Sequence, residues 1–468
     1  MFALSDLLRI NAWTGAESPS AQPALKWGLK RRMDGPSADD GKLAGPAKVT
    51  SESNWRHPAI GWGLVLPDND ELDAAARATA DDAPHAIQEL VAARNNAPVF
   101  RYVTGHQGGF LRRYFSDGKF QDPSLAGSAP GIARGQLPRY LLIYAPPERI
   151  PWRFQYVANS STFVGRIWLE GDALTNYVNA LLKDWSDTPS NPLAPVVWSV
   201  NLGEPDITWL MDTVISKRLR DRFAEGELTE GASMFNDDAT AAALASALAK
   251  HTPSLIASTS HGMTGPLSTP AQMNADLGMP VGVDHDLVRP ETLLDGWAPN
   301  GAIWYAHACC SAGSDASSRY AGLFDPGSSV ATTLAGVAAT CQDRVAPLPT
   351  ALLGAKHPLR AFAGHVEPTF DWTLRNPETG QPLAHAIVDA LYTRLYQQGE
   401  DRMTLGHALT KVYAEAGAFL AQHAQALEAV NQGAELARER ALYRQLVAMD
   451  RQQLVILGDP TVMLPPLP

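Results

Sequence analysis

The chain has 468 residues, of which 45% are hydrophobic and 19% are charged, and its formal net charge is −11. This length allows one large domain or two to three ordinary domains, with ample apolar residues for a core. The acidic balance argues against a dedicated nucleic-acid-binding surface, which needs clustered Lys and Arg, and no apolar run approaches the roughly 18 residues of a membrane span.

The start of the chain and its cysteines predict the compartment. The first residues include Asp6 and show no continuous apolar segment followed by a cleavage site, so we expect no secretory signal. The chain has only three cysteines, and two of them, Cys309 and Cys310, are adjacent. Such a sparse, odd set argues against a disulfide framework and fits a reducing compartment. We therefore predict a soluble, cytoplasmic protein.

Residues 1–135 differ in pattern from the rest of the chain. They contain irregular clusters of Pro, Gly, Ser and Asp, for example at 34–41 and 122–131, and one amphipathic stretch, 70–95, that predicts a helix. We interpret them as an N-terminal subdomain or arm that packs on a main domain of residues 136–468. The alternative is that they complete the core of that domain.

From about residue 137 onward, strands and helices are predicted to alternate. This order favours an α/β fold with a mostly parallel sheet flanked by helices on both faces. The predicted strands are Arg139–Ala145, Pro195–Val200, Ser254–Ser260, Ile303–Ala308, Leu359–Gly364 and Leu454–Leu457. The predicted helices are Asp238–Lys250, Gln381–Gln398, Met403–Val430 and Ala434–Met449.

Two of the predicted strands end in reactive side chains beside small residues. The segment 254–262 ends in His261 and Gly262, and the segment 302–314 contains Cys309 and Cys310. Neighbouring parallel strands would bring an imidazole and a thiol to the same edge of the sheet.

This pair of groups has a recognisable chemistry. A thiol with a pKa of about 8.5 is only partly ionised at neutral pH, whereas a nearby imidazole accepts its proton and later protonates a leaving amine. Gly262 would let a substrate carbonyl approach, so that backbone N–H groups bind the developing oxyanion. The pattern predicts a cysteine endopeptidase.

The two segments resemble those of the caspase-like superfamily of cysteine peptidases, which includes caspases, metacaspases, gingipains and bacterial CHAT proteases. In that group a His-Gly after one apolar strand precedes an Ala-Cys or Asp-Cys after the next, about 50 residues later in caspases. Here the spacing from His261 is 48 residues to Cys309 and 49 to Cys310. The Val-Gly-Arg at 164–166 and the Leu-Gly-Asp-Pro-Thr at 457–461 are similar to the gingipain and CHAT branch.

The resemblance covers residues from about 137 to 465. It implies the caspase-like mostly parallel sheet and a His-Cys dyad that needs no cofactor and no aspartate to orient the histidine. The Cys-x-x-Gly pattern of metacaspases and CHAT proteins selects Cys310, three residues before Gly313, whereas a caspase-style alignment of the strand selects Cys309. We predict Cys310 as the nucleophile, Cys309 as the alternative, His261 as the base and Gly262 as the oxyanion-binding residue.

Three carboxylates are candidates for substrate binding. Asp315 directly follows the nucleophile segment, and Glu367 and Asp371 follow a predicted strand where the superfamily builds part of its specificity pocket. Acidic residues there would favour a basic P1 side chain, Lys or Arg. The alternative is that all three are ordinary surface turn residues.

Other histidines have simpler interpretations. His285 stands in Asp284-His285-Asp286, but no CxxC, HExxH or EF-hand spacing accompanies it, so we predict no metal. His307, two residues before Cys309, is either a helper of the thiol or, more commonly, a packed histidine.

The resemblance implies a regulated intracellular protease that cleaves a protein or peptide, held or triggered by an activating or inhibiting protein, with bacterial defence as one such role. Two alternatives stay open. One is a catalytically silent caspase-like scaffold that binds a partner. The other is a thiol transferase or a nucleotide-binding doubly wound protein, in which His261 and Cys310 would lie far apart.

Overall fold

The computed structural model describes residues 50–105, 109–187, 190–398, 402–434 and 437–468, and the backbone of two short strands. These strands, β1 (Leu8–Arg9) and β2 (Ser20–Ala21), pair in antiparallel fashion. Contacts divide the chain into two compact units, residues 1–49 and 50–468. The start of the chain and the cluster at 34–41 lie outside the described residues.

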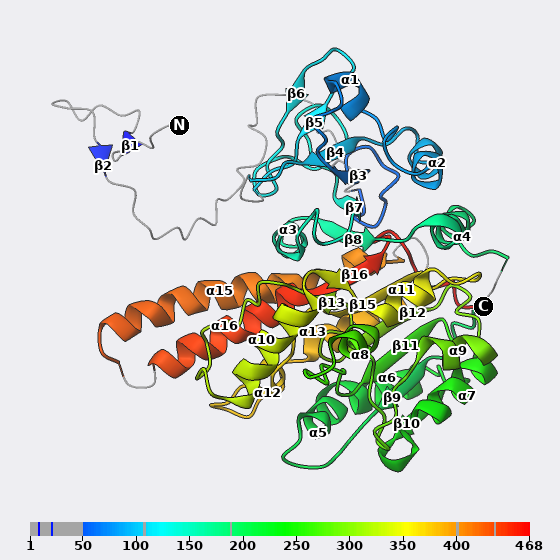
Figure 1. Cartoon of the computed structure of the whole chain (residues 1–468), viewed down its shortest axis with the longest axis vertical. Helices are drawn as coiled ribbons and strands as arrows, with labels where there is room; N and C mark the ends of the chain where they lie inside the picture. The colour runs from blue at the N-terminus through cyan, green and yellow to red at the C-terminus, as the bar shows by residue number, and fades with distance from the viewer. Residues whose placement is uncertain are drawn as a thin grey trace, which may run out of the picture. The chain divides into compact units, whose positions relative to one another are not determined.

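A ten-stranded sheet forms the centre of the second unit (Figure 1). Its order is β10-β9-β11-β12-β15-β16-β8-β7-β3-β4. All neighbouring strands are parallel except β15 and β16, which are antiparallel. The sheet therefore consists of two parallel halves that run in opposite directions and meet at β15 and β16. The α/β prediction with a mostly parallel sheet is confirmed.

The first half contains β10 (Ala232–Phe235), β9 (Val196–Ser199), β11 (Leu255–Thr259), β12 (Ile303–His307) and β15 (Ala361–His365). The second half contains β16 (Leu454–Gly458), β8 (Phe163–Ile167), β7 (Tyr140–Tyr144), β3 (Trp62–Pro67) and β4 (Val99–Tyr102). All six predicted strands are present, and β3, β4, β8 and β10 are additional.

Residues 50–135 are part of this sheet. Two of its strands, β3 and β4, come from this region, and the compact unit begins at Thr50. The structure thus divides the chain near residue 50 and not near residue 135. Residues 50–135 thus contribute two strands to the sheet.

Helices flank the sheet and connect its parallel strands. Those of the first part of the chain are α1 (Ala74–Arg77), α2 (His85–Ala93), α3 (Trp152–Ala158), α4 (Gly171–Leu182), α5 (Ile207–Met211), α6 (Lys217–Glu225), α7 (Ala241–His251), α8 (Pro270–Asp276) and α9 (Pro290–Gly296). The later ones are α10 (Ser329–Cys341), α11 (Pro347–Leu353), α12 (Asp371–Leu374), α13 (His385–Asp389), α14 (Leu405–Ala408), α15 (Thr410–Asn431) and α16 (Ala437–Gln453). Single π-helical turns extend α5 (Asp212–Ser216) and α13 (Ala390–Arg394).

The predicted helices are found with two adjustments. The helix expected over 70–95 is divided into α1 and α2, because Pro84 stands directly before α2 and disfavours helical backbone at the residue before it. The helix expected over 403–430 begins with the short α14 before the long α15. Helices α15 and α16 lie side by side (Figure 1). Among the described residues, no helix is both long enough and apolar enough to cross a membrane.

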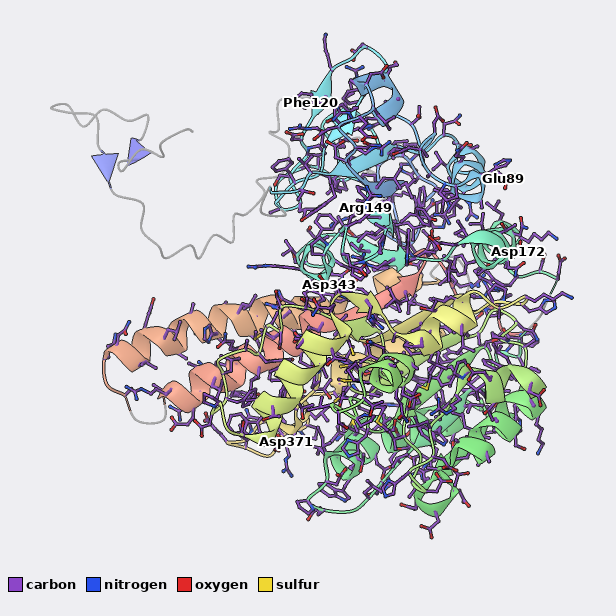
Figure 2. The ribbon with its side chains drawn as sticks, viewed as in Figure 1. Glu89, Phe120, Arg149, Asp172, Asp343 and Asp371 are labelled. Carbon is purple, nitrogen blue, oxygen red and sulfur yellow. The ribbon has the colours of Figure 1, made fainter. Side chains whose placement is uncertain are left out.

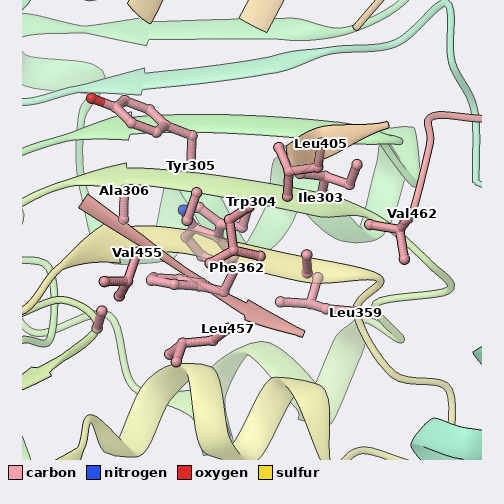
Figure 3. Close-up of a cluster of buried hydrophobic side chains, with 14 of the residues drawn as sticks. Ile303, Trp304, Tyr305, Ala306, Leu359, Phe362, Leu405, Val455, Leu457 and Val462 are labelled. Carbon is pink, nitrogen blue, oxygen red and sulfur yellow. The ribbon is translucent and has the colours of Figure 1, made fainter. Parts of the chain in front are cut away.

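The middle strands are buried on both faces, as is usual for parallel sheets covered by helices. Each residue of β11, β12, β15 and β16 is buried. Figure 3 shows side chains of β12, β15 and β16, including Trp304, Phe362 and Leu457, packed in one cluster. This core fixes the ends of β11 and β12, where the candidate residues lie.

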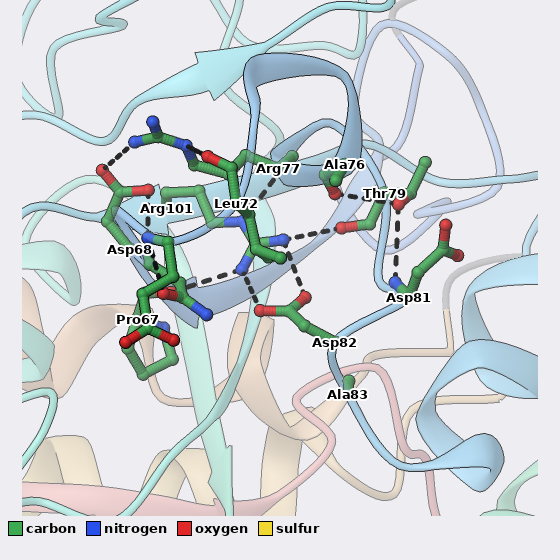
Figure 4. A network of polar contacts seen from close by, with 12 residues as sticks. Pro67, Asp68, Leu72, Ala76, Arg77, Thr79, Asp81, Asp82, Ala83 and Arg101 are labelled. Carbon is green, nitrogen blue, oxygen red and sulfur yellow. Dashed lines mark hydrogen bonds and ion pairs between the residues drawn. The ribbon is translucent and has the colours of Figure 1, made fainter.

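A buried arginine organises the segment that follows β3 (Figure 4). Arg101 of β4 is fully buried and makes two hydrogen bonds to the carboxylate of Asp82, at 2.8 and 2.9 Å. It also donates to the carbonyls of Thr79, at 2.8 Å, and Arg77, at 3.0 Å. Each of these contacts holds part of residues 67–82 against the sheet.

The Gly-Asp-Pro turn after β16 ties the end of the chain to the second half of the sheet. Gly458 has a φ of 113°, which favours glycine, and it directs the backbone into the turn. Asp459 is buried, accepts hydrogen bonds from the indole of Trp62 at 3.1 Å and from the Thr461 N–H at 2.9 Å, and lies 3.3 Å from Arg94. The buried carboxylate of this turn therefore has a structural role, since it joins Trp62, Arg94 and Thr461.

Candidate active site

His261 and Cys309 follow the carboxyl ends of β11 and β12, at the same edge of the sheet. The two strands are parallel neighbours, and their last paired residues are Thr259 and His307. Just beyond them, the Ser260 N–H donates to the His307 carbonyl at 3.3 Å. Counting two residues onward from the last pair, His261 stands opposite Cys309. The adjacency of these strands contrasts with the rival interpretation in which the histidine and thiol lie far apart.

Gly262 lies directly against the backbone of Cys309. A Cβ atom added to Gly262 would lie 1.9 Å from the carbonyl oxygen of Cys309, so no larger residue fits without movement of the backbone. Burial raises the pKa of the Cys309 thiol, whereas the nearby backbone N–H groups of Thr369, Gly262 and Cys309 itself oppose the shift.

The side chain of the adjacent Cys310 lies in the protein interior. Cys310 is fully buried and has a left-handed backbone, with φ of 56°. Its side chain belongs to an apolar cluster with Met273, Leu277, Val337 and Cys341. Burial raises the pKa of its thiol well above the ordinary value. The backbone conformation thus separates the two thiols, with Cys309 beside Gly262 and Cys310 in the interior.

An aspartate that was not expected contacts the histidine. Nε2 of His261 lies 3.0 and 3.1 Å from the carboxylate oxygens of Asp206, and both side chains are partly exposed, at 41% and 31%. Asp206 follows β9 and caps α5, accepting from the Thr208 N–H at 2.9 Å. Burial alone would raise the pKa of Asp206, but the hydrogen bonds from Thr208 and His261 lower it below its ordinary value.

The resemblance implied that no aspartate orients the histidine, and this contact differs from that expectation. A usable signal was present in the sequence: Asp206 follows the predicted strand 195–200, whose carboxyl end lies at the same edge as that of β11. The intervening turn made the distance to His261 impossible to judge from the sequence.

Two of the three predicted substrate-binding carboxylates lie near each other. Glu367 is buried and accepts from the Arg319 N–H at 3.1 Å and from the Gln453 side chain at 2.8 Å. Burial raises the pKa of Glu367 to about 7, and the charge of the nearby Asp315 contributes to that increase. Burial likewise raises the pKa of Asp315, which is partly buried. Glu367 therefore departs from the surface-turn interpretation.

Asp371 lies apart from this pair. It is exposed, is the first residue of α12, and accepts a hydrogen bond from the Trp372 N–H at 2.9 Å (Figure 2). These features match the surface-turn interpretation.

Beneath the strand ends lies a buried polar cluster. Nδ1 of His307 lies 2.8 Å from the hydroxyl of Tyr305, and the rings of His307 and His365 are 4.7 Å apart. Nε2 of His365 lies 3.9 Å from Asp450. Burial lowers the pKa of both histidines. His307 is thus a packed, neutral histidine, in line with the simpler of its two interpretations.

The Asp284-His285-Asp286 segment forms a tight turn. His285 has a φ of 66°, and the Asp286 N–H donates to the Asp284 side chain at 3.2 Å. Within residues 50–468, as far as the structure describes them, no three His, Cys, Asp or Glu side chains are grouped as metal ligands would be.

No family model and no curated protein matches the chain. Among solved structures, it is similar to the complex of the pro- and mature domains of RgpB from Porphyromonas gingivalis, with 11% identity and a TM-score of 0.46 over 86% of this chain and 80% of that chain. It is also similar to the Arg-specific cysteine proteinase gingipain R (RgpB), with 11% identity and a TM-score of 0.45 over 88% of this chain and 79% of that one.

A third similarity is to the separase–securin complex of Saccharomyces cerevisiae, with 10% identity and a TM-score of 0.34. It covers 73% of this chain and 16% of that chain. Because the sequences are so distant, the chemistry of the site has to be inferred from its own residues.

Proposed function

We propose that the protein is a cysteine endopeptidase in which Cys309 is the nucleophile and His261 is the general acid and base. The observation that carries the proposal is the close approach of Gly262, the residue after His261, to the backbone of Cys309. Cys309 replaces Cys310, the first choice from the sequence, because the Cys310 thiol lies in an apolar cluster.

In this proposal, Asp206 fixes the tautomer of the His261 imidazole. A carboxylate that accepts the proton on Nε2 holds the imidazole in the tautomer whose Nδ1 is free to accept a proton. Nδ1 would then take the thiol proton of Cys309 and later deliver it to the leaving amine. Asp206 acts through His261 and is therefore a positioning residue.

The reaction would proceed by acyl transfer. The Cys309 thiolate attacks the carbonyl carbon of the scissile peptide, and the carbonyl oxygen becomes an oxyanion beside the sulfur. In this proposal the backbone N–H groups near Cys309, among them those of Gly262 and Thr369, would donate to that oxyanion. The amine leaves with the proton from His261, and water then hydrolyses the thioester.

We assign the preference for a basic P1 side chain to Glu367 and Asp315. Their mutual proximity concentrates negative charge, and a cationic side chain would relieve the repulsion between them. Asp371 is left out of this set because it is exposed on α12. A protein or peptide substrate, control by a partner protein, a cytoplasmic location and a role in bacterial defence stay predictions from the sequence.

One experiment tests the nucleophile, the base and the P1 preference together. The protein is treated with peptide acyloxymethyl ketones that carry Arg, Lys or Asp at P1, and the labelled residue is identified by mass spectrometry. We expect labelling of Cys309 by the Arg and Lys probes, lost in Cys309→Ala and strongly reduced in His261→Ala. Cys341→Ala is the matched thiol control and should label normally. Labelling of Cys310 in the wild type would overturn the assignment.

One observation favours a catalytically silent scaffold as the second candidate. Burial raises the pKa of the Cys309 thiol, which disfavours the thiolate that catalysis requires. If the folded protein fails to label with every probe, at pH values up to about 9, above the ordinary thiol range, this second candidate replaces the first.

A further inference from the structure

A pocket lies in the second half of the sheet, the half that contains β3 and β4. Its volume is about 230 Å³, and it opens where β3 and β4 begin. Its lining includes three arginines, Arg56, Arg94 and Arg113, and two tryptophans, Trp55 and Trp62, but no carboxylate. The pocket is therefore strongly cationic.

Arg94 is the central residue of this pocket. Its side chain is only 5% exposed, and its guanidinium stacks on the rings of Trp55, at 4.3 Å, and Trp62, at 4.4 Å. Nη2 donates to the Thr461 hydroxyl at 3.1 Å and lies 3.3 Å from Asp459. The other terminal nitrogen, Nη1, is buried and has no hydrogen-bond partner among the described residues.

This unpaired nitrogen makes Arg94 a buried cation whose donors are not all satisfied. Buried polar groups in proteins are nearly always hydrogen-bonded, and a buried cation is costly unless its donors are satisfied. Asp459 faces only one side of the guanidinium and already accepts from Trp62. Burial lowers the pKa of Arg94, the charge of Asp459 opposes this shift, and the nearby charge of Arg56 adds to it.

The other two arginines add charge around the same cavity. Arg56 stacks on Trp55 at 4.2 Å, so it shares that ring with Arg94. Nη1 of Arg113 donates to the carbonyl of Ile132 at 2.6 Å, which fixes its guanidinium beside the pocket. Fixed guanidinium groups with several donors are well suited to the oxygens of phosphate and carboxylate groups.

We propose that this pocket binds the oxyanion group, a phosphate or a carboxylate, of a small molecule. The more exposed guanidinium groups of Arg56 and Arg113 would donate to the oxygens of the ligand, and the charge of the buried Arg94 would add to the attraction. The pocket is separate from the candidate active site, since β3 stands five strands away from β12 in the sheet, roughly 24 Å at ordinary strand spacing.

The test uses the full chain with inorganic phosphate and with citrate as probes, at constant ionic strength set by NaCl. Binding is measured by isothermal titration calorimetry and by the shift in melting temperature. We expect saturable binding of at least one probe to the wild type. Arg56→Gln and Arg113→Gln should each weaken it by roughly 10- to 100-fold, the usual effect of losing a charge-assisted contact. Arg94→Gln should abolish it.

Arg220→Gln is the matched control, because Arg220 is an exposed arginine of α6 in the other half of the sheet. Its binding should equal that of the wild type. Arg94→Gln also removes the contact with Asp459, so Arg56→Gln and Arg113→Gln decide the result if that variant fails to fold.

The outcomes separate the sources of the oxyanion. Binding of phosphate alone identifies a phosphorylated ligand, and binding of citrate alone identifies a carboxylate ligand. The proposal is overturned if neither probe binds the wild type, or if Arg56→Gln and Arg113→Gln bind as well as Arg220→Gln does. Labelling of Cys309 in the same variants should be unchanged, so this result is independent of the proposed peptidase activity.

Discussion

The two halves of the sheet are built alike, but two of their buried polar clusters differ, the one around Arg166 and the one beneath the candidate active site. In the second half, the buried Arg166 donates from all three nitrogens, to the Gln155 side chain and to the carbonyls of Ala145 and Ile150. In the first half, the cluster beneath the candidate active site leaves Nε2 of His307 and Nδ1 of His365 without partners among the described residues.

This difference indicates which buried polar groups only stabilise the fold and which accompany a candidate site. Polar groups that are fully paired fix the positions of strands and loops, as Arg101 and Arg166 do. Unpaired buried polar groups are unfavourable, and those at the ends of strands β12 and β15 lie beneath the candidate active site, as is common at functional sites. Arg94 shows the same feature within the second half, at the pocket proposed to bind an oxyanion.

The largest expected effect separates the two adjacent cysteines of the first half. Cys309→Ala should lower kcat/KM for a basic P1 peptide by roughly 10⁴-fold or more, because the nucleophile is lost. Cys310→Ala should leave kcat/KM within about 10-fold of the wild type and lower the free energy of unfolding by roughly 1 kcal/mol, because it only opens a small cavity. Peptide hydrolysis and urea unfolding measure the two effects, and equal loss of activity in both variants would contradict the assignment.

The next effect concerns the orientation of the histidine. Asp206→Asn should lower kcat by roughly 10²- to 10⁴-fold with little change in KM, since the imidazole loses the acceptor that fixes its tautomer. Glu204→Gln, in the same loop and exposed, should behave as the wild type. Steady-state kinetics across pH values distinguishes the roles, because a purely structural loss would also lower the melting temperature.

A comparable effect, on stability instead of activity, is expected in the second half. Arg101→Gln should reduce the free energy of unfolding by roughly 3–5 kcal/mol, because the carboxylate of Asp82 and two carbonyls lose a buried partner. Arg112→Gln is the matched control: Arg112 makes the same two-bond contact with Asp122, at 2.8 Å for both, but at the surface. Its loss should cost about 1 kcal/mol or less. Urea titrations measure both, and equal losses would contradict the distinction.

The smallest effect is a pH dependence of substrate preference. Burial raises the pKa of Glu367 to about 7, so the carboxyl is largely protonated below that pH and ionised above it. The ratio of kcat/KM for P1 Arg over P1 Gln should therefore increase by roughly 10-fold from pH 6 to pH 8. Glu367→Gln should flatten this dependence, whereas Asp371→Asn, at an exposed position, should keep it. A ratio independent of pH in the wild type would remove Glu367 from the specificity pocket.

The sequence predicts much of the fold because buried parallel strands are continuous apolar runs. The six strands it predicts, including those that carry His261 and Cys309, are such runs. Strand β10 is not predicted because it is short. Strand β3 is not predicted because Gly63 and Pro67 interrupt its apolar pattern. The pairing of β16 between β15 and β8 depends on contacts over hundreds of residues, which no local pattern reveals.

The candidate site is predictable in its residue types but not in its finer geometry. The spacing of His261 and the cysteines follows from two strand ends, which local patterning predicts well. The choice between Cys309 and Cys310 depends on one left-handed backbone conformation, and the contact of Asp206 with His261 depends on the path of a turn. One sequence shows that Asp206 follows the strand 195–200, but it shows neither this contact nor that backbone conformation.

The place of β16 has a consequence for synthesis. It is the last strand along the part of the chain that the structure describes, yet it lies in the middle of the sheet, between β15 and β8. While the ribosome still covers this segment, the growing chain holds two incomplete half-sheets, each with an open edge that can pair wrongly. The helix before β16, α16, supplies Asp450 and Gln453 to the groups around Glu367 and His365. A nascent chain therefore lacks the partners of Glu367 and His365, and the strand that joins the two half-sheets, until residues 450–458 have emerged from the ribosome.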